Sequence, residues 1–311
     1  MHINVNLCAM AVGNLFAPHH FEKPDLFHAS LPKDFCPEVF DTSSLSTPIF
    51  IEAMLRGETN PALIKDANGK RFIIKQDNSA RGQKHHMNEW FAPISEILGS
   101  TIARSVNVKA NYVRLIKPKV RVRGKPSCDR AATVHDYIPA VTLKHRGFPV
   151  MGLKWSNSLR ENLEFFSKFQ GLPKLFAVDT FICNPDRHPG NILYDIWTNS
   201  ICGVDFGRAF YSGNVAEKMI EYFETADFKT LETRHWKALL EYRDALKELV
   251  ELWPVERIYS LFWKSVEMSE LFTCRPIKSE FFWHEAQTRL KLVEENYNSV
   301  RGLLEYLETS F

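Results

Sequence analysis

The hydrophobic pattern of the chain changes at about Pro139. Before this point the apolar residues form short β-like runs, at 49–53, 71–75, 105–108, 112–116 and 133–138. After it they recur at three- and four-residue steps, as in amphipathic helices. A β-rich part followed by a helical part predicts an α+β fold with two lobes. We expect an irregular leader at 1–47, an N-terminal lobe at 48–139 and a helical C-terminal lobe at 140–311.

One helix is expected to interrupt the β-rich part, at about residues 84–98. Its apolar face would consist of Met87, Phe91, Ile94 and Leu98. Gly99 should end this helix, because glycine is common just beyond a helix C-terminus. Pro93 lies inside the expected helix and should kink it.

The helical part also divides into expected elements. A first helix is expected from about residue 159 until Gly171 ends it, and a buried helix at 175–183. Residues 192–194 and 201–204 should form a short hairpin. Three further amphipathic helices are expected after it, the last over about 286–307.

The charge balance and the cysteines exclude several classes of protein. A formal net charge of +2 is too small for a dedicated binder of the nucleic-acid backbone. The six cysteines form no Cys-x-x-Cys pair and no Cys/His cluster with zinc-finger spacing. No apolar run approaches the roughly 18 residues that cross a bilayer, and no Lys or Arg precedes the apolar residues 7–17 as in a signal peptide. We therefore expect a cytoplasmic protein without a transmembrane segment.

The most informative stretch comes directly after the expected buried helix. It reads Asn184-Pro185-Asp186-Arg187-His188-Pro189-Gly190-Asn191 and is followed, after a short strand, by Val204-Asp205-Phe206-Gly207. Phosphoryl transfer needs an acceptor for the proton of the attacking hydroxyl and Mg²⁺ ions that neutralise the phosphate oxygens. Asp186 can accept that proton, and Asn191 follows it by five positions, the separation in the protein-kinase catalytic loop. The Asn191 carbonyl and the Asp205 carboxylate suit a cation that prefers oxygen.

Arg187 and His188 belong to the same catalytic stretch. Because Asp186 already fills the position of the base, we expect His188 to brace the loop by hydrogen bonds. Each of these short motifs alone is a common accident and would more often be a turn or a surface ion pair. Their occurrence together, in order and behind a buried helix, favours a phosphotransferase site.

The N-terminal lobe offers the two parts that such a site still needs, a loop over the phosphates and a cation that binds them. The loop residues are Gly57, Glu58, Thr59 and Asn60. The glycine would let backbone N–H groups approach the phosphates closely, although a plain hairpin turn fits equally well. Lys75 ends an apolar strand and would bind the phosphates, unless it merely extends into solvent. Glu89, on the expected helix, would pair with Lys75 rather than lie on a solvated helix face.

Taken together, these motifs resemble the compact HipA-like kinases over about residues 49–225. The resemblance is carried by Gly57 to Asn60, Lys75, the Asn88-Glu89 helix with Leu98-Gly99, Tyr137-Ile138-Pro139, and the run from Asp179 through Asn184-x-Asp186-Arg187-His188-x-x-Asn191 to Asp205-x-Gly207. The Asp-Arg-His-x-x-Asn-Ile and Asp-Phe-Gly elements also resemble phosphatidylinositol 3- and 4-kinases, distant relatives with the same two-lobed fold. HipA toxins are regulated by phosphorylation of a serine in the phosphate loop, whereas this loop offers only Thr59.

The resemblance implies a two-lobed protein-kinase-like fold and an ATP-dependent, Mg²⁺-requiring kinase. The roles that it implies are those of catalytic base for Asp186, Mg²⁺ ligands for Asn191 and Asp205, and a nucleotide-phosphate contact for Lys75. We expect ATP near Tyr137 and Ile138, and transfer of its γ-phosphoryl to a Ser or Thr hydroxyl of a protein substrate.

Two other functions compete with this interpretation. A lipid kinase is favoured by the Asp-Arg-His motif and disfavoured by the lack of accessory domains. A nucleotide-binding pseudokinase or partner-binding module is disfavoured by the complete set of Lys75, Asp186, Asn191 and Asp205. The segment from Arg114 to Arg130, with seven basic residues and one acid, is either the solvated face of an edge hairpin or a dock for an acidic protein, an RNA or an anionic lipid headgroup.

Overall fold

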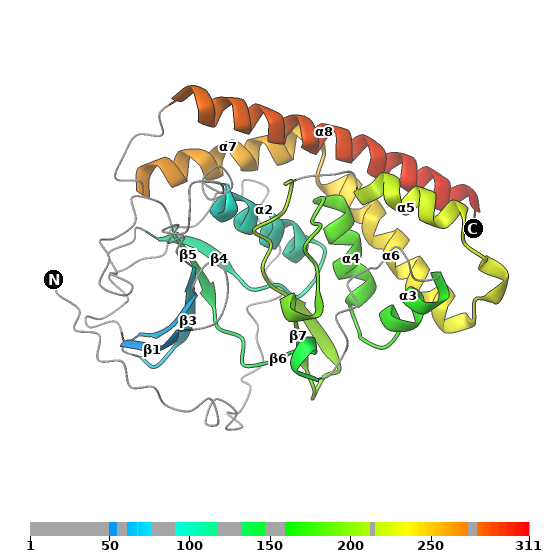
Figure 1. Ribbon diagram of the computed structural model, residues 1–311, viewed down its shortest axis with the longest axis horizontal. Coiled ribbons are helices and arrows are strands. Elements are labelled where there is room, and N and C mark those ends of the chain that lie inside the picture. The colour runs from blue at the N-terminus through cyan, green and yellow to red at the C-terminus, as the bar shows by residue number, and fades with distance from the viewer. Residues whose placement is uncertain are drawn as a thin grey trace.

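A computed structural model of the chain describes residues 50–54, 61–66, 68–75, 91–116, 132–146, 159–211, 215–272 and 279–310. An antiparallel sheet lies at one end of the molecule and a group of helices at the other (Figure 1). The fold is therefore α+β, as the change of pattern in the sequence predicts. The leader expected at 1–47 lies outside the described residues, and the lobe boundary at Pro139 stays a prediction.

The larger sheet has five antiparallel strands in the spatial order β1-β2-β3-β5-β4. The strands are β1 (Phe50–Met54), β2 (Ala62–Lys65), β3 (Arg71–Lys75), β4 (Val113–Ile116) and β5 (Ala132–Asp136). Side chains alternate between the two faces of a strand. One face of the sheet is an apolar cluster that includes Ile64, Phe72 and Val134. The other face carries Lys75 at the end of β3, opposite Thr133 of β5.

The sheet differs from the predicted strands in two places. Strand β2 was not predicted, because its four residues are too few to show an alternating pattern. The strand predicted at 105–108 is wrong, because the structure has the end of a helix and a turn there. Val106 and Val108 are buried in the core of the helical part, so their β-branched side chains reflect burial and not a strand.

The described helix of the N-terminal part is α2 (Ala92–Ser105), while residues 84–90 of the expected helix lie outside the described residues. Pro93 lies in its first turn, where a missing N–H costs nothing, so the predicted kink does not occur there. The helix also continues past Gly99, which was wrongly expected to end it. A Cβ on Gly99 would lie 2.5 Å from the Cβ of Phe206, so this glycine permits a close approach between two segments.

A small second sheet follows, with β6 (Val141–Thr142) beside the hairpin of β7 (Ile192–Asp195) and β8 (Ser200–Gly203). The hairpin confirms the prediction. Among the described residues, two α-helices stand between β6 and β7, α3 (Leu159–Phe166) and α4 (Leu172–Phe181). Both were predicted, but α3 ends at Phe166 and does not continue to Gly171 as expected. Gly171 precedes α4 with φ of 83°, in the left-handed region that favours glycine.

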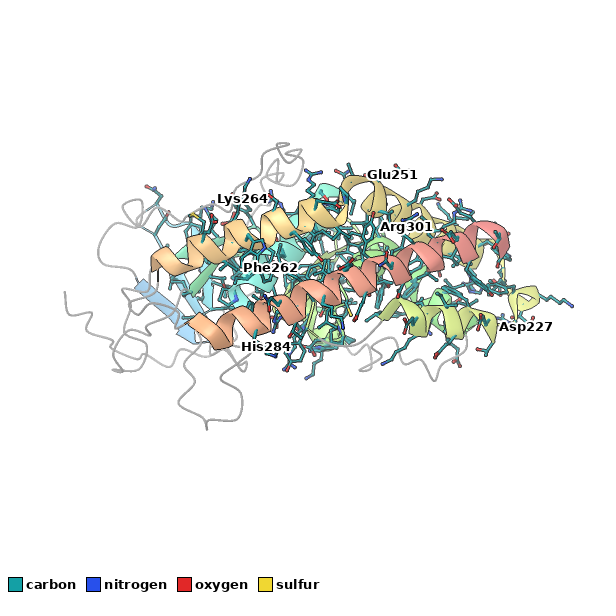
Figure 2. The ribbon with its side chains drawn as sticks, turned by 90° about the horizontal axis from the view of Figure 1, so that it is seen from above. Asp227, Glu251, Phe262, Lys264, His284 and Arg301 are labelled. Atoms are coloured by element: carbon teal, nitrogen blue, oxygen red, sulfur yellow. The ribbon has the colours of Figure 1, made fainter. Side chains whose placement is uncertain are left out.

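Within the described part of the chain, four further α-helices follow the hairpin, where the sequence predicted three. They are α5 (Val215–Glu224), α6 (Thr233–Leu252), α7 (Val255–Phe272) and α8 (Ser279–Ser310). Figure 2 shows α7 and α8 lying side by side, and Phe262 of α7 is buried and stacks on Phe91 at a centroid distance of 6.1 Å. Within the described ranges, no helix is both long and apolar enough to cross a membrane.

The main hydrophobic core belongs to the helical part, and α2 is included in it. Ile94, Leu98 and Ile102 of α2 lie in the same cluster as residues of α4, α6, α7 and α8. A smaller cluster joins Ile97 of α2 to β4, with Met268 of α7 packed against it. The helix that faces the sheet is thereby fixed against the helical part as well (Figure 1).

Candidate active site

Lys75 lies between two carboxylates that come from distant parts of the chain. Its Nζ donates to Oε1 of Glu96, on α2, and to Oδ1 of Asp205 at 2.9 Å. Glu96 is buried with 4% of its side chain exposed, whereas 46% of the Asp205 side chain is exposed. The Glu96 carboxylate is thus enclosed next to the lysine, whereas the Asp205 carboxylate is also accessible from outside.

The charges of this trio determine which group is ionised. Burial opposes the charge on Lys75, but Glu96 and Asp205 outweigh it and raise the pKa of Lys75 above its ordinary value. The Lys75 charge holds the pKa of Asp205 well below its ordinary value. Burial raises the pKa of Glu96 to about 7, against the opposing charge of Lys75. Asp205 is therefore the carboxylate that stays anionic and available to a cation.

Glu96 also fixes the segment that follows Asp205. Its Oε2 accepts a hydrogen bond of 2.9 Å from the backbone N–H of Phe206. The ring of Phe206 is fully buried against Gly99 and Gly203. Asp205 itself has φ of 62°, a left-handed conformation that Asp adopts more readily than most residues. The anchored Phe206 holds this conformation and keeps the Asp205 carboxylate directed at Lys75.

A buried ion pair shapes the catalytic loop. Arg187 donates from Nε to Asp179 Oδ2 at 2.8 Å and from a terminal nitrogen to Asp179 Oδ1 at 3.0 Å. The other terminal nitrogen donates to the carbonyl of Asn191 at 2.8 Å and to that of Val204. Arg187 thus ties the loop to the strand that leads to Asp205. It is a positioning residue, because its guanidinium is turned into the protein.

Asp186 and Asn191 of the loop lie next to each other. Asn184 accepts from the backbone N–H of Asp186 at 3.2 Å, and Nδ2 of Asn191 donates to the Asp186 carbonyl at 3.1 Å. The Asp186 side chain is 44% exposed and so remains open to a substrate. His188 accepts at Nδ1 from the N–H of Gly190 at 3.0 Å, which is the bracing hydrogen bond that the sequence predicted.

Asn191 and Asp205 fit a magnesium ion. Because Nδ2 of Asn191 is used by the Asp186 carbonyl, the side-chain oxygen is the atom left to act as a ligand. Mg²⁺ is commonly held by one or two carboxylates together with substrate phosphates and water. Among the described residues, no three His, Cys, Asp or Glu side chains gather as a protein-only metal cage.

Several predicted residues can now be placed. Lys75, Asp186, Asn191 and Asp205 belong to one arrangement around the catalytic loop. Tyr137 and Ile138 lie in the connection from β5 to β6, where the Tyr137 N–H donates to the carbonyl of Arg71 at 3.2 Å. Outside the described residues lie the loop residues Gly57, Glu58, Thr59 and Asn60, together with Glu89.

Glu96 was not among the site residues predicted from the sequence. The predicted partner of Lys75 was Glu89, which lies outside the described residues. Among the described residues, Glu96 holds that place. A signal existed, since Glu96 is the only acid of α2 and stands among the apolar residues Ile94, Ile97 and Leu98. An acid amid buried residues of a helix requires a cationic partner.

The arrangement matches the general description of protein kinases. In these enzymes a lysine on the third strand pairs with a glutamate of the next helix, and the Asp-Phe-Gly aspartate and the loop asparagine hold the metal. Here Lys75 ends β3, Glu96 lies on α2, and Asp205 opens Asp-Phe-Gly. The chain therefore has the two-lobed protein-kinase-like fold that the sequence predicted.

Comparison with known proteins gives only distant likenesses. No protein-family model matches the chain, and no curated protein matches it. Among solved structures, the chain is similar to the Helicobacter pylori proinflammatory kinase CtkA, with 15% identity and a TM-score of 0.49 over 83% of this chain and 96% of that one.

Two further solved structures are similar over most of the chain. HipA of Shewanella oneidensis MR-1, solved with HipB and operator DNA, shows 13% identity and a TM-score of 0.38 over 89% of this chain and 76% of that one. The Rio2 kinase of Chaetomium thermophilum, in an ADP/Mg²⁺-phosphoaspartate complex, shows 14% identity and a TM-score of 0.36 over 81% of this chain and 71% of that one.

Proposed function

We propose that this protein is an ATP-dependent kinase that transfers the γ-phosphoryl of Mg²⁺-ATP to a Ser or Thr hydroxyl of a protein. The observation that carries the proposal is the position of Lys75 between Glu96 and Asp205. A partly buried lysine oriented by one carboxylate and facing a second, half-exposed one supports the binding of a phosphate together with its metal ion.

In the proposed reaction Asp186 is the base. The oxygen of the acceptor hydroxyl forms a bond to the γ-phosphorus, while the bond from that phosphorus to the bridging oxygen breaks and leaves its electron pair on ADP. The proton of the hydroxyl passes to the Asp186 carboxylate, which is 44% exposed and can receive it. Arg187 and His188 hold the loop in shape for this step.

The remaining roles concern the nucleotide. Bound Mg²⁺ would neutralise charge on the phosphate oxygens, and Asn191 and Asp205 are its proposed ligands. Lys75 is the proposed phosphate contact, and Tyr137 and Ile138 are proposed to line the nucleotide site. The loop of Gly57, Glu58, Thr59 and Asn60 keeps its proposed place over the phosphates.

The proposed substrate and docking site rest on the sequence. We propose that the substrate is a cytoplasmic protein and that the segment from Arg114 to Arg130 docks it. Only the first residues of that segment are described, and Arg114 forms an ion pair with Asp136. A lipid substrate remains the alternative outcome of the assay below.

The decisive experiment separates Asp186 from Asp205. Asp205→Asn removes the anion that holds Mg²⁺, so we expect both calorimetric binding of Mg²⁺-ATP and turnover to collapse. Asp186→Asn leaves the metal ligands in place, so we expect binding to persist while transfer falls by about 10²- to 10⁴-fold, the usual range for a positioned proton acceptor.

Turnover would be measured with labelled ATP on a cell lysate and, in parallel, on phosphoinositide vesicles. Label in protein alone supports the proposed substrate class, and label in lipid alone would replace it. Loss of nucleotide binding in Asp186→Asn, with wild-type binding and activity in Asp205→Asn, would refute the assigned roles. Absence of Mg²⁺-ATP binding to the wild type would refute the function itself.

A further inference from the structure

A third charged residue stands beside the proposed base. Arg208 follows directly after Asp-Phe-Gly, and its Nε lies 3.9 Å from Oδ2 of Asp186. The Arg208 side chain is 46% exposed, and its guanidinium lies 5.4 Å from the ring centre of Tyr211. A guanidinium therefore reaches the point where an acceptor hydroxyl would meet Asp186.

The backbone around Arg208 is held on both sides. Ala209 donates from its N–H to the Phe206 carbonyl at 2.9 Å, and its own carbonyl accepts from Ser95 Oγ of α2 at 2.8 Å. The N–H of Phe210 donates to the carbonyl of Ile182, beside the catalytic loop, at 2.8 Å. The Cα of Arg208 is thus fixed to both halves of the site, and only its side chain has room to move.

Two other cations of the site are held by other groups. Lys75 is held by Glu96 and Asp205, and it enters the site from the sheet. Arg187 is buried against Asp179 and two backbone carbonyls, and its guanidinium lies 4.6 Å from the Phe206 ring centre. Arg208, in contrast, lies next to Asp186, the proposed base.

We propose that Arg208 contacts the γ-phosphoryl group during its transfer and stabilises the charge of the transition state. This inference rests on the proposed function. Negative charge is spread over the three equatorial oxygens of the phosphoryl in that state, and a planar guanidinium binds such oxygens in pairs. The bonds formed and broken and the path of the proton to Asp186 are those of the proposed reaction, because Arg208 exchanges neither proton nor bond.

The pairing with Asp186 does not prevent this role. Both side chains are nearly half exposed, and an ion pair of this length in contact with water stabilises a protein little. The contact of Arg208 with Asp186 can therefore be exchanged for an incoming phosphoryl at small cost. The same shift would uncover Asp186 as the acceptor hydroxyl arrives, so one movement would serve both partners.

The test compares a ground-state complex with a transition-state mimic, Mg²⁺-ADP with tetrafluoroaluminate. Calorimetry would measure the affinity of Arg208→Gln for Mg²⁺-ATP and for the mimic, next to turnover with labelled ATP. We expect nearly unchanged affinity for Mg²⁺-ATP and a loss of about 10²- to 10³-fold in turnover, the range for removal of one positioned donor. Affinity for the mimic should fall in proportion to turnover, because both depend on the transition state.

Two variants serve as controls. Arg208→Lys keeps the charge without the planar fork, so part of the affinity for the mimic should return. It also provides the measurement if Arg208→Gln does not fold. Arg160→Gln removes an arginine of similar exposure from an ion pair with Glu232 and should leave both affinities unchanged.

The outcomes that would contradict the inference can be told apart from those that would contradict the proposed function. Wild-type affinity for the mimic in Arg208→Gln would overturn the inference and leave the proposed function in place. Equal losses for Mg²⁺-ATP and the mimic would also overturn it, because Arg208 would then bind the ground state. Wild-type protein that binds no Mg²⁺-nucleotide would refute the proposed function, and the inference would fall with it.

Discussion

At the scale of single residues, the polar side chains beside Lys75 in the sheet are held by hydrogen bonds. His135 of β5 is fully buried, and its ring nitrogens contact Asn111 Nδ2 and Thr133 Oγ1, each at 2.8 Å. Thr133 is the residue opposite Lys75 in the sheet register. Burial, with the charges of Lys75 and Arg114, holds the pKa of His135 well below its ordinary value. The imidazole is therefore neutral in the folded protein.

This neutral histidine predicts a pH dependence of stability. In the unfolded chain His135 takes up a proton below about pH 6.5, whereas in the folded protein it does not. Below that pH the unfolded state binds the extra proton, so the free energy of unfolding falls as pH falls, by up to about 1.4 kcal/mol per pH unit from this group. Above about pH 6.5 the contribution of His135 is constant.

The measurement is urea unfolding of the wild type and of His135→Gln at pH 7.5, 6.5 and 5.5. Other groups titrate in both proteins and cancel in the difference. We expect the wild type to lose stability faster than the variant between pH 6.5 and 5.5. Parallel curves for the two proteins would show that the buried imidazole is charged in the folded state.

At the scale of elements, α2 is the part on which the site depends. It supplies Glu96 to Lys75, Ser95 to the segment after Asp205, and the surface on which Phe206 lies. Gly99 is the residue that permits the last contact, because a Cβ there would lie 2.5 Å from Phe206 Cβ. Glycine at this position lowers the helix propensity of α2 but permits the close contact with Phe206.

Gly99→Ala is therefore expected to destabilise the protein although alanine is the better helix former. Alanine gains about 1 kcal/mol of helix propensity. The displaced Phe206 should cost about 1–3 kcal/mol, the usual range for overpacking. Because Phe206 positions Asp205, turnover with Mg²⁺-ATP should fall as well. Urea unfolding and the labelled-ATP assay measure the two effects.

Gly302 of α8 provides the matched control. A Cβ there would meet its nearest neighbour, Ile220 Cδ1, at 4.0 Å, an ordinary contact distance. Gly302→Ala should thus raise the free energy of unfolding by up to about 1 kcal/mol and leave turnover unchanged. If Gly99→Ala proved as stable and active as Gly302→Ala, the close contact of α2 with Phe206 would not govern the site.

At the scale of the whole molecule, the two parts of the fold share packing through α2. Ile94, Leu98 and Ile102 belong to the core of the helical part, while Ile97 packs with β4. The far end of α2 is also tied, because Trp253, at the end of α6, donates from its indole Nε1 to Ser105 Oγ at 2.7 Å. The lobe boundary expected from the sequence therefore does not correspond to a gap in the hydrophobic packing.

We therefore expect a single calorimetric unfolding transition, with equal calorimetric and van't Hoff enthalpies. Ser105→Ala leaves the buried indole N–H of Trp253 without this acceptor, which should cost about 1–3 kcal/mol. The variant should move the entire transition to a lower temperature without splitting it. Two separate transitions in either protein would mean that the sheet and the helical part unfold independently.

The sequence predicted most of the elements that stand on strong local patterns. Strand β3, the hairpin of β7 and β8, and helices α3 and α4 lie close to where apolar spacing placed them. The errors fall on short or ambiguous segments. Strand β2 has only four residues, α2 continues past its expected end at Gly99, and Val106 and Val108 are buried without belonging to a strand.

By itself, the sequence determined the order and spacing of the chemical groups. Asp186 and Asn191 share one loop, and Asp205 follows after a short hairpin, so local geometry alone sets their separation. Only the tertiary structure decided which distant residues meet. Glu96 reaches Lys75 across 21 positions and Asp205 reaches it across 130, while Arg208 reaches Asp186 from the other side of the hairpin. Such contacts depend on how the helices pack against the sheet, and no local spacing records that.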